Sequence, residues 1–367
     1  MKNTIVLGLF FVMMISSVLI ETPSAVITEP EDVSVLIVLG DKFGWSYFEL
    51  LEILQDWKCD ITTAGPISHL ESCANQPPRP IDVDVLFSDI NREDLDQYDV
   101  LLVPSGAQWQ TLIHTSSALS LINMAYEEGL IVSGICVGVI PLAVANVTRD
   151  RLVASHNFAY PYVKESGGKT LPFMRVVSDG NVITGDNGGG EPAGYESAPH
   201  YELCVAIMKK LFGYSYFQDI TVNPELVGND TVYYISVTTS EPIHLFDNVT
   251  TPEITDVVVN LHTSDNDTII ASVNLIQSAE VTTFKGNITG LELDDYIIDL
   301  QIIDANVSME VVQDAALFTA QNITIPSTST TSSATTEDRM PIETYALIGA
   351  VPIMAIIVFE VWRRRAK

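Results

Sequence analysis

The chain has 367 residues, and its 18 Lys and Arg residues against 47 Asp and Glu residues give a formal net charge of −29 at pH 7. Nucleic acid is not an expected partner of so acidic a protein, because phosphate binding requires a basic face. The length allows two domains of ordinary size, and the 47% of hydrophobic residues can form a core in each, which excludes a wholly disordered chain.

The N-terminal end contains an apolar run over residues 4–20 (TIVLGLFFVMMISSVLI), which follows Lys2 and precedes small residues that end at Ala25. This pattern predicts a secretory signal peptide over residues 1–25, cleaved near Ala25. An uncleaved N-terminal membrane anchor is the alternative interpretation of the same segment.

Residues 33–213 alternate short apolar runs with helical patterns. Such an alternation predicts a doubly wound, mostly parallel α/β sheet flanked by helices. The expected strands are 33–39, 60–63, 99–106, 130–134, 152–155, 174–177 and 182–184, and the expected helices are 47–57, 117–128, 139–145 and 200–212. Asp179 and Gly180 mark the turn of a hairpin between the last two strands. Residues 186–191 (DNGGGE) lack the Lys-Ser/Thr of a phosphate loop and are expected to form an exposed loop near the site.

The segment 134–138 (GICVG) carries the clearest chemical signal, because an apolar strand runs into it and a helical pattern begins directly after it. This is the G-x-nucleophile-x-G arrangement, in which small flanking residues permit a tight turn that lifts one side chain above the sheet edge. The apex is Cys136, and a helix N-terminus at this point favours the thiolate. A buried structural cysteine in a tight turn is the alternative.

These features together resemble the ThiJ/PfpI superfamily, which has the class I glutamine-amidotransferase-like fold. The resemblance covers roughly residues 33–213, and its markers are VLIVLG, DITTAG, YDVLLVPSGA, SGICVG, RLVASH, DGNVITG and IMKKLFG. Members of the superfamily include intracellular peptidases, glyoxalase or deglycase-type enzymes, chaperones and oxidation sensors.

The resemblance implies roles for individual residues. Cys136 matches the nucleophile and oxidisable thiol, and His156 matches the histidine that faces this cysteine. The backbone N–H groups of Gly106 and Val137 match the pair that stabilises an oxyanion. His200 is a weaker alternative base, because His200-x-Glu202 is similar to the His-x-Glu of true amidotransferases. No cofactor is implied, and no Cys/His cluster has the spacing of metal ligands.

The chain also departs from the superfamily pattern on its first helix. Many members carry a glutamate there that hydrogen-bonds the cysteine, whereas Ser46 occupies this position, or Tyr47 with a one-residue slip. The turn at Cys136 also lacks the Cys-His pair of the peptidase branch, so peptidase activity is not expected.

The segment 216–325 contains strand-like stretches without a helical period, which predicts an immunoglobulin-like β-sandwich. It has one basic residue, Lys285, against 17 acidic ones. Asn-x-Ser/Thr sequons predict a glycosylated surface domain, with Asn and Thr at ordinary strand ends and turns as the alternative. The sequons are at Asn146, Asn229, Asn248, Asn266, Asn287, Asn306 and Asn322, the first of them in the α/β domain.

The C-terminal residues predict attachment to a membrane. A Ser/Thr-rich stalk over 326–344 precedes the apolar run 345–362 (YALIGAVPIMAIIVFEVW), which is long enough for one transmembrane helix. The basic tail 363–367 belongs in the cytoplasm by the positive-inside rule, which places the N-terminal ectodomain outside the cell.

Two hypotheses for the function follow. In the first, Cys136 attacks the carbonyl carbon of a small acyl or aldehyde substrate with His156 as the proton-transfer group. In the second, the protein is a non-catalytic surface binding or redox-sensing module with a cell-surface partner. The superfamily also suggests a homodimer, and an exported location makes a disulfide between Cys59 and Cys73 a candidate.

Overall fold

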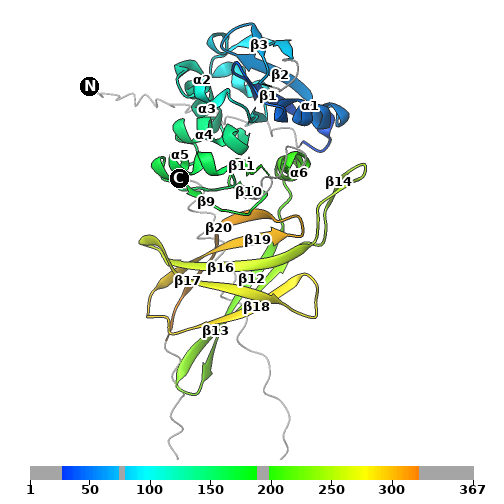
Figure 1. Ribbon diagram of the computed structural model, residues 1–367. Coiled ribbons are helices and arrows are strands. Elements are labelled where there is room, and N and C mark those ends of the chain that lie inside the picture. The colour runs from blue at the N-terminus through cyan, green and yellow to red at the C-terminus, as the bar shows by residue number, and fades with distance from the viewer. Residues whose placement is uncertain (1–26, 74–78, 188–197, 322–367) are drawn as a thin grey trace, which may run out of the picture. The chain divides into compact units, whose positions relative to one another are not determined.

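The computed structural model describes residues 27–73, 79–187 and 198–321 (Figure 1). As far as residue 211 the chain contains helices and strands in the order that the sequence predicts, with additional short strands at residues 69–71, 80–82, 85–86 and 169–170. The helices are α1 (Ser46–Asp56), α2 (Trp109–Leu112), α3 (Ser116–Glu127), α4 (Val139–Val144), α5 (Tyr160–Glu165) and α6 (His200–Leu211). The strands are β1 (Ser34–Val38), β2 (Asp60–Gly65), β3 (His69–Glu71), β4 (Pro80–Asp82), β5 (Val85–Leu86), β6 (Val100–Val103), β7 (Ile131–Ile135), β8 (Leu152–Val153), β9 (Lys169–Thr170), β10 (Val176–Asp179) and β11 (Val182–Gly185).

The central strands form a mostly parallel sheet in the order β10-β11-β7-β6-β1-β2-β5. Every neighbouring pair in this order is parallel except β10 and β11, which form the predicted antiparallel hairpin. The hairpin turns at Gly180, whose φ of +62° is unstrained without a side chain. The α/β fold expected from the sequence is therefore confirmed.

Helices cover both faces of this sheet, because its strands are apolar on both sides. On one face, Ile37 of β1 belongs to a core that includes Leu50 of α1 and Ile207 of α6. On the other face, Leu36 of β1 belongs to a core with Ile122 of α3 and residues of α4. Successive residues of β1 thus serve opposite cores.

After α6 the described chain contains strands alone, as the green-to-orange part of Figure 1 shows. The strands are β12 (Phe217–Val227), β13 (Asp230–Thr239), β14 (His244–Phe246), β15 (Val249–Thr250), β16 (Ile254–Thr263), β17 (Asn266–Gln277), β18 (Thr283–Thr289), β19 (Asp295–Asp304) and β20 (Ser308–Thr319). A third core joins residues of β13 and β18, such as Val237 and Phe284, to residues of β16 and β19, such as Val259 and Leu300. This β-rich region is the large addition to the α/β fold that the sequence predicts.

The β-rich region continues the sheet of the α/β part, which the sequence does not predict. Strand β20 pairs in parallel with β10, and the register runs from Val176 opposite Ser308 to Asp179 opposite Val311. The hairpin β14–β15 also packs on the helices, with the ring of Phe246 centred 5.1 Å from that of Trp57. The pairing covers β10, which would otherwise be an open edge of the sheet.

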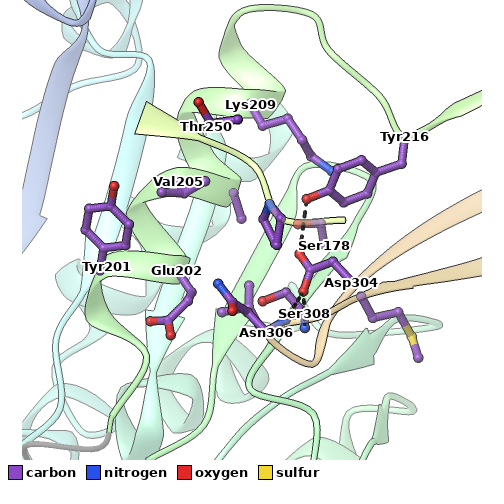
Figure 2. A pocket seen from close by; sticks show the side chains of 14 residues that line it. Ser178, Tyr201, Glu202, Val205, Lys209, Tyr216, Thr250, Asp304, Asn306 and Ser308 are labelled. Carbon is purple, nitrogen blue, oxygen red and sulfur yellow. Dashed lines mark hydrogen bonds between the residues drawn. The ribbon is translucent and has the colours of Figure 1, made fainter. Parts of the chain in front are cut away.

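A buried polar network lies where α6 meets the β19–β20 turn, beside a small pocket (Figure 2). Lys209 is 5% exposed, forms an ion pair with Glu310, and places its Nζ 3.3 Å from the centre of the Tyr216 ring. The Tyr216 hydroxyl donates to Asp304 at 3.1 Å, and the Glu310 carboxylate accepts from the hydroxyl of Ser215. These groups satisfy one another in a site from which water is largely removed.

Several predictions fall on residues outside the described part of the chain. They are the signal peptide over 1–25, the stalk over 326–344, the membrane helix over 345–362 and the basic tail over 363–367. Within residues 27–73, 79–187 and 198–321, no helix combines the length and the hydropathy needed to cross a membrane.

The predicted disulfide between Cys59 and Cys73 is not formed in the structure, where all four cysteines are free thiols. Cys59 precedes β2 and points into the same core as Cys204 of α6, whereas Cys73 follows β3 and is half-buried. Burial raises the pKa of the Cys59 thiol to about 12. Cys59 therefore lies in the core, whereas Cys73 lies near the surface.

Candidate active site

The candidate site is built from three chain segments that follow parallel neighbouring strands. Strands β1, β6 and β7 lie side by side, so their carboxyl ends meet at one edge of the sheet. The segments that follow them are 43–46, 104–106 and 136–138. Ligand sites in open α/β sheets lie at this edge.

Cys136 stands at the apex of the turn between β7 and the short 3-10 helix η4 (Cys136–Gly138). Its φ of +57° is the left-handed conformation, which costs a residue with a side chain of the order of 1–3 kcal/mol. A Cβ on Gly138 would lie 2.3 Å from the Val103 carbonyl oxygen, and one on Gly134 would lie 3.0 Å from that of Gly138. Gly138 therefore has no room for a side chain and Gly134 has little, as the sequence motif predicts.

Backbone contacts hold the second segment against the first. The Ser105 N–H donates to the Ser46 hydroxyl at 2.7 Å, and the Gly44 N–H donates to the Ser105 carbonyl at 2.8 Å. Gly106 has a φ of +133°, and a Cβ there would lie 2.1 Å from the Gly44 nitrogen. Ser46, one of the two residues that the sequence matches to the superfamily glutamate, thus positions Ser105.

Cys136 is half-buried, and its sulfur interacts with Val137, which the sequence predicts, and with Ser105 and Asp186, which it does not. Burial raises its pKa above the usual value and Asp186 adds to this, while hydrogen bonds from the Ser105 side chain and the Val137 N–H oppose the rise. The pKa of Cys136 is thus raised, whereas the sequence predicts a lowered pKa and a thiolate. The helix that follows η4 has only six residues, so its dipole does not offset the loss of hydration.

His156 is the N-cap of the 3-10 helix η5 (Asn157–Ala159), which contacts η4. Its Nδ1 accepts a hydrogen bond from the Phe158 N–H at 3.1 Å, and its ring stacks on the Phe158 ring at 5.2 Å between centroids. Burial lowers the pKa of the imidazole, although the nearby Asp186 opposes this. Since Nδ1 accepts, a neutral ring carries its proton on Nε2, which makes that nitrogen a hydrogen-bond donor.

Sequence reasoning gave no role at this site to Ser105 or Asp186, although it placed the loop that begins at Asp186 near the site. Asp186 follows β11 and is 6% exposed, so the expectation of an exposed loop is wrong at this residue. It interacts electrostatically with both Cys136 and His156. The available signal was position in the sequence, because Asp186 directly follows β11, Ser105 comes two residues after β6, and both strands end at the same edge of the sheet.

His200 begins α6 and is 6% exposed. Burial lowers its pKa, against the effect of the carboxylates of Glu49 and Glu202. Among the described residues its Nε2 has no hydrogen-bond partner, while Glu202 forms an ion pair with Arg175 at 2.8 Å. The predicted His200-x-Glu202 pair is therefore divided between two environments, and neither residue shares a described contact with Cys136.

The part of the chain that contains this site matches a known protein family. The model of the DJ-1/PfpI family matches residues 33–193, which contain the turn at Cys136 and the strands that frame it. Residues 33–193 are a DJ-1/PfpI family domain. Sequence resemblance to the ThiJ/PfpI superfamily is thereby confirmed for this part of the chain.

Two curated relatives from Arabidopsis thaliana share part of the DJ-1/PfpI domain. DJ-1 protein homolog E is 28% identical over 99 residues, and DJ-1 protein homolog F is 28% identical over 111 residues. The matches cover 27% and 30% of this chain, and they span only 25% and 27% of the two relatives.

Solved structures are also similar to about half of the chain. A ThiJ/PfpI domain protein from Brachyspira murdochii is 19% identical with a TM-score of 0.42, covering 50% of this chain and 98% of the other. Drosophila melanogaster DJ-1beta is 20% identical with a TM-score of 0.42, covering 49% and 91%.

Proposed function

We propose that the protein is a membrane-anchored, extracytoplasmic member of the DJ-1/PfpI group whose Cys136 site acts on a small carbonyl compound. The observation that carries the proposal is the strained Cys136 at the apex of the turn, with the Ser105 side chain and the Val137 N–H at its sulfur. A cysteine with a purely structural role does not need a left-handed backbone at a sheet edge.

The proposed reaction begins with the thiolate fraction of Cys136. The sulfur bonds to the carbonyl carbon, the C=O electron pair moves to oxygen, and the oxygen takes a proton from water to give a hemithioacetal when the substrate is an aldehyde. The N–H groups of Gly106 and Val137 stabilise the negative oxygen, and the Nε2–H of neutral His156 donates a further hydrogen bond to it. His156 acts as a donor here, since its Nδ1 is engaged by Phe158.

The experiment compares the full chain with Cys136→Ala and Cys136→Ser, using methylglyoxal and activated acyl esters as substrates. Turnover is expected to disappear in both variants, with Cys73→Ala as the matched control that retains it. Equal turnover by Cys136→Ala and the unchanged chain would overturn the proposal.

The export part of the proposal is supported by the exposure of the sequons and by the apolar and basic pattern of residues 345–367. Asn322 lies outside the described residues, and the other six sequon asparagines are exposed on the structure. Protection of the 363–367 tail from protease in sealed cells, with a mass loss on glycosidase treatment, is the expected result. A protease-accessible tail and no mass loss would contradict it.

A second candidate is a non-catalytic surface module that binds a partner or senses oxidants, as a monomer or a homodimer. The raised pKa of Cys136 favours the partner-binding form of this candidate, because it reduces the fraction of reactive thiolate that both catalysis and oxidant sensing need. The serine at position 46, where the sequence matches the superfamily glutamate, also favours it. Slow alkylation of Cys136 at every pH up to 10, together with no turnover, would select it over the enzyme.

A further inference from the structure

In the β-rich region, one imidazole and two carboxylates come together on three neighbouring strands. One ligand atom from each of His262 on β16, Asp299 on β19 and Asp314 on β20 lies within 4.8 Å of the other two. On β19, Ile298 and Leu300 point into the core, so the alternation of a strand places Asp299 on the opposite face. These are residue types that bind metal ions, and they lie outside the DJ-1/PfpI domain.

A long hydrogen bond to a backbone group orients the His262 ring. The side chain is 7% exposed, and its Nδ1 lies 3.3 Å from the Thr263 carbonyl oxygen. A carbonyl oxygen only accepts, so Nδ1 carries the proton and Nε2 of the neutral ring presents a lone pair. An imidazole whose other nitrogen donates to a carbonyl is the usual arrangement of a metal-binding histidine.

The distance from His262 Nε2 to Asp299 Oδ2 is longer than that of a strong ion pair. It is 3.3 Å, whereas a charge-assisted hydrogen bond from an imidazolium to a carboxylate is about 2.7–2.9 Å. Two ligands of a tetrahedral zinc ion, each about 2.0–2.1 Å from the metal, stand about 3.3 Å apart. This spacing fits an edge of a zinc coordination sphere, and it also lies within the range of an ion pair.

Asp314 supplies the second carboxylate through an irregularity in the sheet. The register of β19 and β20 shifts between Ile298 and Leu300, and Asp314 takes a φ of +52°. Its N–H donates to Asp299 Oδ1 at 2.9 Å, which leaves Asp299 Oδ2 facing the imidazole. Within the described part of the chain, neither carboxylate forms an ion pair with Lys or Arg, so a cation has no protein competitor.

We propose that His262, Asp299 and Asp314 bind one divalent transition-metal ion, for which Zn²⁺ is the best fit, with water completing the coordination. One nitrogen and two oxygens suit zinc, whereas Ca²⁺ requires six to eight oxygen ligands. The site joins three strands of the β-rich region.

The test is zinc binding by the full chain, stripped with chelator and titrated with Zn²⁺ alone in a calorimeter. One zinc ion per chain is expected, with affinity reduced tenfold or more in Asp314→Asn. This residue is exposed, so the substitution leaves the core unchanged. Asp256→Asn, an exposed position on β16 outside the cluster, is the matched control and is expected to bind as the unchanged chain does.

His262→Gln supplies a second arm, with His244→Gln as its control at an exposed histidine. Cobalt(II) replaces zinc in this arm, because its visible d–d bands respond to the ligands and geometry around the metal, whereas zinc has no such bands. The expected result is loss of the cobalt bands in His262→Gln alone. Absence of zinc binding by the unchanged chain, or equal binding by Asp314→Asn, would overturn the proposal. An imidazolium signal from His262 that persists at neutral pH in the presence of zinc would also overturn it, since the contact would then be an ion pair.

Discussion

In the DJ-1/PfpI domain, the groups around Cys136 come from loops that follow parallel strands, whereas the His262 cluster of the β-rich region lies on the faces of antiparallel strands. The first arrangement depends on close backbone approach, such as the Gly138 contact with the Val103 carbonyl. The second depends on charge and register, as does the Lys209–Glu310 pair where the two parts meet. A site at the ends of strands thus depends on how closely the backbone segments approach one another. A site on the face of a sheet depends on which side chains the strand register places side by side.

The largest effect is expected from breaking the charge arrangement at the junction. Lys209→Met leaves Glu310 buried without its counter-charge, which is expected to lower the free energy of unfolding by about 3–5 kcal/mol in urea denaturation. Lys210→Met, at the exposed neighbouring position, is the control and should change it by less than about 0.5 kcal/mol. Equal losses in the two variants would show that the ion pair does not hold the parts together.

Backbone fit at the site is tested with two glycines. Gly138→Ala places a methyl group 2.3 Å from a carbonyl oxygen and is expected to cost about 3 kcal/mol of stability. Gly129→Ala meets nothing within 4 Å and suffers only from its φ of +87°, so about 1–2 kcal/mol is expected. Thermal unfolding of both variants gives the comparison, and a Gly129→Ala loss as large as that of Gly138→Ala would contradict it.

His156 has two nitrogens with different tasks, which two substitutions separate. His156→Asn keeps an acceptor for the Phe158 N–H, whereas His156→Ala removes it and should cost about 1 kcal/mol of stability. Both variants lack the Nε2–H and are expected to lose about 10- to 100-fold in turnover. Full turnover by the His156→Asn variant would show that His156 only caps the 3-10 helix and has no role in the reaction.

The smallest effect is expected in the pH dependence of Cys136 alkylation, followed with iodoacetamide in a Cys73→Ser background. Because burial raises the pKa, less thiolate is present at neutral pH than in a free cysteine, and the rate should still be rising above pH 8.5. Asp186→Asn removes a negative charge, lowers the pKa and should speed alkylation at pH 7.5 by less than about tenfold. Ser105→Ala should slow it. A rate that levels off below pH 8 would contradict the raised pKa.

The sequence predicts the strand-end site better than the strand-face cluster, and the reason is geometric. A G-x-C-x-G motif after an apolar run specifies its own backbone, so the position of Cys136 at a turn follows from local residues. The contacts of Ser105 and Asp186 follow from strand order alone, which the alternation of strands and helices only partly determines. His262, Asp299 and Asp314 meet because of a register shift between β19 and β20, and no local pattern encodes that shift.

The pairing of β10 with β20 has a consequence for the order in which the protein folds. Strand β10 ends at Asp179 and its partner begins at Ser308, so about 130 residues must be synthesised before this pair can form. At about 5–20 residues per second, the edge of β10 stays open for roughly 6–26 seconds after it leaves the ribosome. During that interval the nascent chain exposes unpaired backbone groups to other proteins, and chaperone dependence should concentrate there.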